Sequence, residues 1–149
     1  MAKKRKIEVI ARGVCVMDAH ILLCHGKTSS QMYLPGGHIE FGETGRQALV
    51  REIAEEMGRK SKAGRFLGCC EHAFIQKGKP HAEINLVFEL AVKGISPKKP
   101  VKAAEDWIAF TWLPLDELAD ARFEPASLVK HLVAQREDVF SVDKNEDGA

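Results

Sequence analysis

Apolar and polar residues alternate over much of this 149-residue chain, in the period-two pattern typical of half-buried strands. The stretch from Ile7 to Cys24 follows the pattern apart from Asp18-Ala19-His20, which predicts two strands joined by a tight turn. Residues 62–76 and 84–92 are also rich in strand-forming types, and residues 77–80 between them include glycine and proline. These two segments predict a hairpin.

The pattern changes to a helical period between Thr44 and Met57. Thr44 and Gln47 have the spacing of a capping box, and Gly58 stands where a helix usually ends. We therefore predict a helix over residues 44–57, with one apolar face that must pack on a core. That face consists of Leu49, Val50, Ile53, Ala54 and Met57.

Shorter elements are predicted on either side of these segments. Pro35-Gly36-Gly37 predicts a sharp loop that allows close approach, because glycine adopts conformations closed to other residues. Residues 107–112 predict a further strand, 114–119 a short helical turn and 125–136 a final helix. The buried stripe of that helix is expected to be Leu128, Val129, Leu132 and Val133.

The order of strands, helix, strands and helix favours an α/β (α+β) fold with helices packed against a mixed sheet. A chain of this length suits one domain, which we assign to residues 1–140. Residues 141–149 are polar and are expected to form a disordered C-terminal tail.

The overall charge indicates no polyanionic partner. The 22 basic and 21 acidic residues give a net charge of +1, so neither nucleic acid nor an anionic membrane is expected. We interpret the basic run Lys3–Lys6 as a solvated terminus, although a nuclear address or a phosphate contact has the same pattern. No signal peptide and no bilayer-spanning stretch is visible.

Four cysteines occur in apolar surroundings without CxxC spacing, and we expect small buried residues with free thiols. They are Cys15, Cys24, Cys69 and Cys70. Zinc binding by Cys24-His25, or by Cys69-Cys70 with His72, would depart from the ligand spacings of known structural sites. Free thiols favour a reducing, cytoplasmic location.

The acidic residues of the predicted helix are its main chemical feature. Glu52, Glu55 and Glu56 stand at i, i+3 and i+4, which places them together, roughly opposite the apolar stripe. They also lie in the C-terminal half, where the helix dipole disfavours negative charge. Two carboxylates about 6 Å apart repel by on the order of 3 kcal/mol, which a divalent cation would reverse. The alternative is a solvated acidic face in which Arg51 and Arg59 pair with the glutamates.

The spacing around this helix resembles a known family signature. Gly37 is followed after five residues by Glu43, and after seven more by the run Arg51–Gly58. This resembles the Nudix box, GX5EX7REUXEEXGU with U aliphatic, at every specified position except the last, where Arg59 stands. The resemblance extends from about Val9 to Val133 and includes the segments 34–36 and 112–118.

The resemblance implies an α/β/α sandwich around a mixed sheet, a Mg²⁺ or Mn²⁺ cofactor and a set of site residues. The implied metal ligands are Glu52, Glu55, Glu56 and the carbonyl of Gly37. Arg51 would orient a glutamate through a salt bridge, and Glu43 would lie beside the cluster or pair with Arg51. The implied reaction is attack of water on a phosphorus of a nucleoside diphosphate linked to another moiety.

Several roles stay open at the level of the sequence. We favour Glu55 or Glu52 as the general base, and we keep Glu89 and Glu105 as bases or extra ligands outside the box. A nucleotide-sensing Nudix module without catalysis is the main alternative function, and a prenyl diphosphate isomerase is a third. We expect a small nucleotide-type substrate, and a homodimer is compatible with the sequence.

Residues that could contact a substrate base or phosphate have core packing or surface hydrogen bonding as their ordinary interpretation. The aromatic candidates are Tyr33, Phe41, Phe74 and Trp107, and the histidine candidates are His38, His72 and His81. Some Nudix subfamilies mark their substrate by a proline or a tyrosine past the box, whereas Phe74 and Ile75 stand in that neighbourhood here. The sequence therefore names no substrate.

Overall fold

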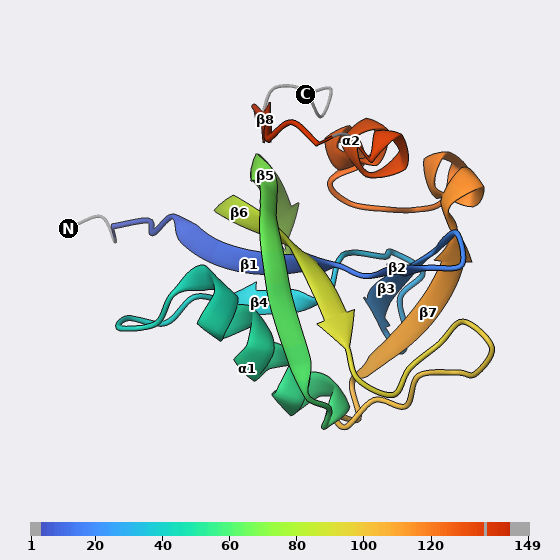
Figure 1. Ribbon diagram of the computed structural model, residues 1–149. Coiled ribbons are helices and arrows are strands. Elements are labelled where there is room, and N and C mark those ends of the chain that lie inside the picture. Colours follow the sequence, from blue (N-terminus) through green and yellow to red (C-terminus); the bar gives the residue numbers. More distant parts are fainter. Residues whose placement is uncertain (1–3, 136, 144–149) are drawn as a thin grey trace.

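The computed structural model describes residues 4–135 and 137–143, which form a mixed α/β fold (Figure 1). Its strands are β1 (Glu8–Val14), β2 (Val16–Met17), β3 (His20–Gly26), β4 (Gly36–His38), β5 (Ser61–Gln76), β6 (Lys79–Val92), β7 (Ile108–Pro114) and β8 (Phe140–Val142). Its helices are α1 (Gly45–Met57) and α2 (Val129–Ala134), with 3-10 turns η1 (Leu115–Asp120) and η2 (Ala126–Leu128). No helix among the described residues is long and apolar enough to cross a membrane.

The strands form two sheets. The five-stranded sheet has the order β4-β1-β6-β5-β8 and is mixed, because β1 runs parallel to β6 and antiparallel to β4. The second sheet, β2-β3-β7, is antiparallel. The predicted hairpin is confirmed as β5 and β6, which pair antiparallel from Ser61↔Val92 to Gln76↔Lys79.

The prediction for residues 7–24 was correct in its turn and wrong in its pairing. Asp18 and Ala19 both have positive φ values, 49° and 57°, as a tight two-residue turn requires. The turn joins β3 to the two-residue strand β2, whereas β1 belongs to the other sheet. The chain changes sheets at Cys15, which is buried in the core between them.

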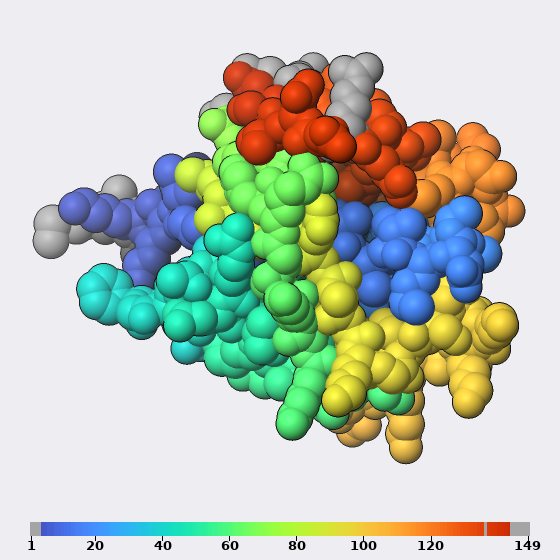
Figure 2. Space-filling model, viewed as in Figure 1, coloured from blue at the N-terminus to red at the C-terminus, as the bar shows by residue number. Residues whose placement is uncertain are grey.

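Two apolar cores cover the two faces of the five-stranded sheet. Alternate residues of β6 show the division, since Phe88 packs in the core that contains α1, and Val87 packs in the core beneath η1, η2 and α2. Figure 1 shows α1 and α2 on opposite sides of this sheet, and Figure 2 shows α1 reaching the surface beside β5. The expected mixed sheet with helices packed against it is therefore confirmed.

The limits of α1 agree with the prediction. Thr44 is the N-cap, its side chain accepts from the backbone of Gln47, and the Gln47 side chain accepts from the Thr44 backbone in return. Gly58 ends the helix in the left-handed conformation, with φ of 65°. The termini of α1 are thus set by local hydrogen bonds.

The predicted faces of α1 need one correction. Ala54 is exposed and Val50 is only partly buried, whereas Ala48 and Glu56 are buried with the rest of the apolar face. The apolar face is rotated because α1 packs against both sheets, which closes a wider arc of the helix than one sheet would. Glu56 therefore does not lie opposite the apolar stripe.

The C-terminal region also differs from the prediction. The expected helix over 125–136 is the turn η2 followed by α2, and Gln135 ends α2 with a φ of 48°. Val133 is 47% exposed rather than buried. Strand β8 occupies the start of the expected tail, because Val142 is buried beside β5 in the second core. Residues 144–149 of that tail lie outside the described residues.

Elsewhere the short elements agree in position. The predicted strand over 107–112 is β7 and the predicted turn over 114–119 is η1. The expected Pro35-Gly36-Gly37 loop is instead the start of β4, since its glycines pair with β1.

We expect Thr44→Ala to lower the free energy of unfolding by about 1 kcal/mol, because one orphan amide of α1 loses its acceptor. Urea unfolding followed by circular dichroism measures this change. Thr28→Ala, in an exposed loop, is the matched control and should leave stability within about 0.5 kcal/mol of the parent. Equal effects of the two substitutions would contradict the role of the cap.

Candidate active site

The two glycines of β4 bring backbone without side chains against β1 and α1. Gly36 has a φ of +141°, and a Cβ there would overlap the carbonyl oxygen of Ala11 on β1. A Cβ at Gly37 would instead meet the carboxylate of Glu52 on α1. Gly36 therefore permits the sheet to form, whereas Gly37 lets the backbone lie directly against an acidic side chain.

Arg51 is the hydrogen-bonding centre of the acidic helix. Its Nε and Nη2 donate to the two carboxylate oxygens of Glu43 at 3.1 and 2.7 Å, a bidentate pair. Its Nη1 donates to Glu52 at 3.0 Å and to Glu55 at 3.3 Å. Nη2 also donates to the carbonyl of His38 at 2.9 Å. One guanidinium thus joins β4, the loop before α1 and two glutamates, and its bonds lower the pKa of Glu43.

Glu56 occupies the most unusual environment in the cluster. Its side chain is 5% exposed, and Oε2 is buried without a hydrogen-bond partner among the described residues. Burial and, next, the charge of Glu52 raise the pKa of Glu56 to about 8, although Arg12 partly opposes them. A buried carboxyl without a partner is costly in its charged form, so it stays neutral or meets a cation.

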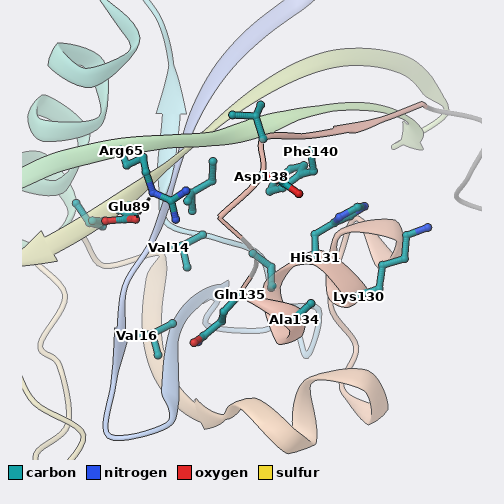
Figure 3. A pocket seen from close by; sticks show the side chains of 14 residues that line it. Val14, Val16, Arg65, Glu89, Lys130, His131, Ala134, Gln135, Asp138 and Phe140 are labelled. Carbon is teal, nitrogen blue, oxygen red and sulfur yellow. Dashed lines mark hydrogen bonds and ion pairs between the residues drawn. The ribbon is translucent and has the colours of Figure 1, made fainter.

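The two acidic candidates outside the box lie in different places. The charge of Glu105 contributes to the raised pKa of Glu56, and the amide of the preceding Ala104 donates to the Glu56 carbonyl at 2.7 Å. Glu89 projects from the other face of the sheet into a cavity beside α2, where Arg65 binds it at 2.9 Å (Figure 3). Of this pair, Glu105 lies next to the acidic cluster and Glu89 does not.

The cluster fits a hard cation in composition, although its side chains are not gathered around one point. In residues 4–135 and 137–143, no three His, Cys, Asp or Glu side chains form a group that could hold a metal ion. The orphaned oxygen of Glu56, the adjacent Glu52 carboxylate and the carbonyl of the partly buried Gly37 are nevertheless the kinds of oxygen ligand that Mg²⁺ or Mn²⁺ prefers. The solvated-face alternative is partly present, since Arg51 binds Glu55, but Arg59 donates to the Lys93 carbonyl instead.

The cysteines give no support to a zinc site. None of the four cysteines forms a disulfide, as expected, and Cys69 alone among them is partly exposed. Burial raises the pKa of Cys24 and of Cys69, which belong to the two zinc sets considered, and so favours their protonated forms over the thiolate that zinc binds. The zinc interpretation is therefore set aside.

A cleft of about 880 Å³ is lined by residues of β1, β5, β6 and η2, and none of its lining residues belongs to α1. Its floor contains Arg12 of β1 with Glu83 and Asn85 of β6. Because the charge of Arg12 acts on the pKa of Glu56, the floor adjoins the buried end of the cluster. Arg12 therefore connects the cleft to the acidic cluster of α1.

The predicted contact residues divide between the cleft and the surface. Those that line the cleft are Tyr33, His72, Phe74 and Trp107. His38 and His81 instead bind the two oxygens of Glu8, at 2.8 and 3.0 Å. Phe41 is fully exposed on the loop before α1.

Sequence reasoning missed the polar floor of the cleft. Arg12 stands between apolar residues of β1, and Glu83 and Asn85 stand at alternate positions of β6 with Ile84 between them. A polar residue at an inward strand position is a signal of a lined cavity, because burial there requires a hydrogen-bond partner. The family signature contains none of the three.

The fold and the site define a class, that of mixed α/β proteins with a cluster of glutamates on one helix held by an arginine. The sequence pattern of the NUDIX domain matches residues 8–132. The chain belongs to the Nudix hydrolase family. Nudix hydrolases generally use divalent metals and act on small nucleotide substrates.

Curated relatives share about a third of their aligned residues with this chain. The ADP-ribose pyrophosphatase of Methanocaldococcus jannaschii is 31% identical over 82% of this chain and 70% of its own length. The 8-oxo-dGTP diphosphatase of Proteus vulgaris is 30% identical over 62% of this chain and 82% of its own. The putative mutator protein MutT4 of Mycobacterium tuberculosis is 33% identical over 57% of this chain, and the match spans only 33% of that protein.

Solved structures agree on the fold. The solution structure of the E. coli ORF135 protein superposes with a TM-score of 0.67 at 24% identity, over 89% of this chain and 93% of that one. The MutT NUDIX hydrolase of Burkholderia pseudomallei gives a TM-score of 0.65 at 25% identity, over 88% and 98%. The overall fold of this chain is therefore similar to that of both proteins.

We expect Gly37→Ala to impair the activity of the site and Gly36→Ala to impair the stability of the fold. At position 37 the new methyl group displaces the flexible Glu52 side chain, so activity should fall while the unfolding free energy changes by less than about 1 kcal/mol. At position 36 it meets fixed backbone at positive φ, so stability should fall by at least about 3 kcal/mol. Urea unfolding and turnover assays distinguish the two, and an active Gly37→Ala variant would contradict the close approach.

The raised pKa of Glu56 predicts a pH-dependent stability of the metal-free protein. The carboxyl binds a proton more tightly when folded, so its contribution is complete below about pH 4.5 and is lost as the pH rises through about 8. Unfolding in EDTA from pH 5 to 9 should show this decline, on the order of 4 kcal/mol at most. Glu56→Gln cannot ionise and should remove the decline, whereas an unchanged slope would contradict the assignment.

Proposed function

We propose that this Nudix hydrolase is a divalent-metal-dependent pyrophosphohydrolase that cleaves a nucleoside diphosphate linked to another moiety. The observation that carries the proposal is the buried, unpartnered oxygen of Glu56 beside Glu52. A monovalent partner such as lysine would satisfy one carboxylate, whereas a divalent cation satisfies several and leaves coordination positions for phosphate.

Glu52, Glu55, Glu56 and the carbonyl of Gly37 are the residues that would hold Mg²⁺ or Mn²⁺. When bound, the metal neutralises the phosphate oxygens, stabilises the leaving phosphate and lowers the pKa of the attacking water. The lack of a side chain at Gly37 leaves its backbone open toward Glu52. The acidic cluster and the cleft together fit a substrate with an anionic end and a longer organic part.

Arg51 acts in this proposal as a positioning residue. Its bidentate bond to Glu43 fixes the guanidinium, which then offers Nη1 to Glu52 and Glu55 on the next turn of α1. A planar fork of donors holds carboxylates in defined directions, which lysine could not do. Arg51 also reduces the repulsion between the glutamates before any cation binds.

Glu55 is the better candidate for the general base. Its side chain is 51% exposed and its bonds to Arg51 are 3.3 and 3.5 Å long, whereas Glu52 is 17% exposed and held at 3.0 Å. A base must reach a water molecule and accept its proton, which requires access to solvent and a weakly held carboxylate. Glu55 meets both conditions.

The substrate belongs to the nucleotide class. The relatives' names include ADP-ribose and 8-oxo-dGTP, both of which are nucleoside diphosphates with a further group. A cleft of about 880 Å³ has room for a nucleoside and its phosphates. The free thiols favour a cytoplasmic location for the reaction.

We expect Glu55→Gln to lower kcat at least about 100-fold on ADP-ribose or a nucleoside triphosphate with Mg²⁺, because the water loses its proton acceptor. Chromatographic assays of nucleoside monophosphate release measure this loss, and circular dichroism checks that the variant is folded. Glu117→Gln, in exposed η1, is the control and should retain full activity.

Chelation by EDTA should abolish turnover by the parent enzyme, and added Mg²⁺ or Mn²⁺ should restore it. Nucleotide binding by calorimetry without metal-dependent turnover on a broad substrate panel would overturn the proposal. That result would favour a nucleotide-sensing module.

A further inference from the structure

Glu83 places a carboxylate in the floor of the cleft, away from the acidic helix. It projects from β6 into the cavity, in the same row of side chains as Asn85. The Nudix signature does not include it, and its carboxylate accepts a hydrogen bond from Asn85 rather than from Arg51. The inference drawn from Glu83 rests on the proposed function, since it concerns the base of the nucleotide.

Asn85 holds Glu83 in a defined direction. Asn85 is 2% exposed, its Oδ1 accepts from Arg12 Nε at 3.3 Å, and its Nδ2 donates to the Cys70 carbonyl at 3.4 Å. Arg12 can only donate and a carbonyl can only accept, so the orientation of the amide is fixed. The same Nδ2 donates to Glu83 Oε1 at 3.4 Å, and Glu83 therefore faces the cleft as an acceptor.

Arg12 is itself anchored to the floor. Besides Asn85, it donates from Nη1 to the Leu34 carbonyl at 3.0 Å, and its guanidinium lies over the Tyr33 ring at 5.4 Å. These contacts hold Arg12 beneath the cleft. They thereby keep the chain of hydrogen bonds from Arg12 through Asn85 to Glu83 rigid. A rigid polar group discriminates between ligands better than a mobile one, because it cannot turn to suit each of them.

We propose that Glu83 is a specificity-determining residue and that the enzyme prefers guanine nucleotides. A carboxylate has about four lone-pair sites and accepts two parallel N–H bonds well, and Asn85 uses one site. Guanine offers two adjacent donors on one edge, N1–H and the N2 amino group. Adenine and cytosine place an acceptor next to their donor, and uracil flanks its one donor with two carbonyls. In each of these bases an acceptor would therefore face a carboxylate oxygen and be repelled by it.

Trp107 supplies the other contact expected of a base site. Its indole is 60% exposed and lines the cleft from the segment just before β7. Its carbonyl accepts from the Lys27 amide at 3.1 Å, which ties that segment to the end of β3. Stacking on an aromatic face is tolerant of base identity, so Trp107 should contribute affinity and Glu83 selectivity.

The test compares binding of GDP, IDP, ADP and UDP by calorimetry in Mg²⁺, with Glu55→Gln as the background so that cleavage does not interfere. IDP differs from GDP only by the N2 amino group. The parent site should bind GDP at least about tenfold more tightly than IDP, because one charge-assisted hydrogen bond is lost. Glu83→Gln should bring the GDP to IDP ratio close to one.

The controls separate selectivity from folding. Glu89→Gln changes the same residue type on the same face of β6, away from the cleft, and should keep the parent ratio. Trp107→Ala should weaken all four diphosphates by a similar factor. If Glu83→Gln fails to fold, Glu83→Asp, which withdraws the carboxylate by one methylene, should reduce the ratio instead.

Two outcomes would overturn the proposal, namely a parent GDP to IDP ratio near one or a ratio that Glu83→Gln leaves unchanged. Both are independent of turnover. Absence of metal-dependent cleavage by the parent enzyme, with base selectivity intact, would overturn the proposed function and leave the role of Glu83 standing.

Discussion

The packing of α1 between two sheets places a carboxyl group in apolar surroundings, and much of the molecule is arranged around this constraint. The apolar core needs the full arc of the helix that contains Leu49, Ile53 and Met57, and Glu56 lies within that arc. Its neutral form is favoured at neutral pH unless a cation is near. A helix that buried only a narrow stripe would leave Glu56 in water, where its carboxylate would need neither a proton nor a nearby cation.

Charge balance around α1 depends on one arginine. Glu43, Glu52 and Glu55 all accept hydrogen bonds from Arg51, which is itself about a quarter exposed. Partial exposure screens the repulsion, and the bidentate pair with Glu43 fixes the guanidinium at little cost in side-chain entropy. The cluster keeps an excess of negative charge. This excess is small enough for the protein to fold and favours the binding of a divalent cation.

The sequence predicted the parts that local interactions determine. The limits of α1 followed from Thr44 and Gly58, and the β5–β6 hairpin followed from its turn residues. Predictions failed where tertiary packing decides. The separation of β1 from β3, the exposure of Ala54 and the strand at Phe140–Val142 depend on contacts between distant segments. A family signature located the acidic helix, but no local pattern could show which strand residues share its cleft.

Arg12 links the two halves of the site. Its charge lowers the pKa of Glu56 against the effect of burial, and its Nε holds Asn85 at the floor of the cleft. Arg12 thus places a cation near Glu56 before any metal binds and, at the same time, orients the Asn85 amide at the floor of the cleft. Removal of Arg12 would leave two buried acceptors, Asn85 Oδ1 and the Leu34 carbonyl, without a donor, which explains why a charged residue is retained in an apolar strand.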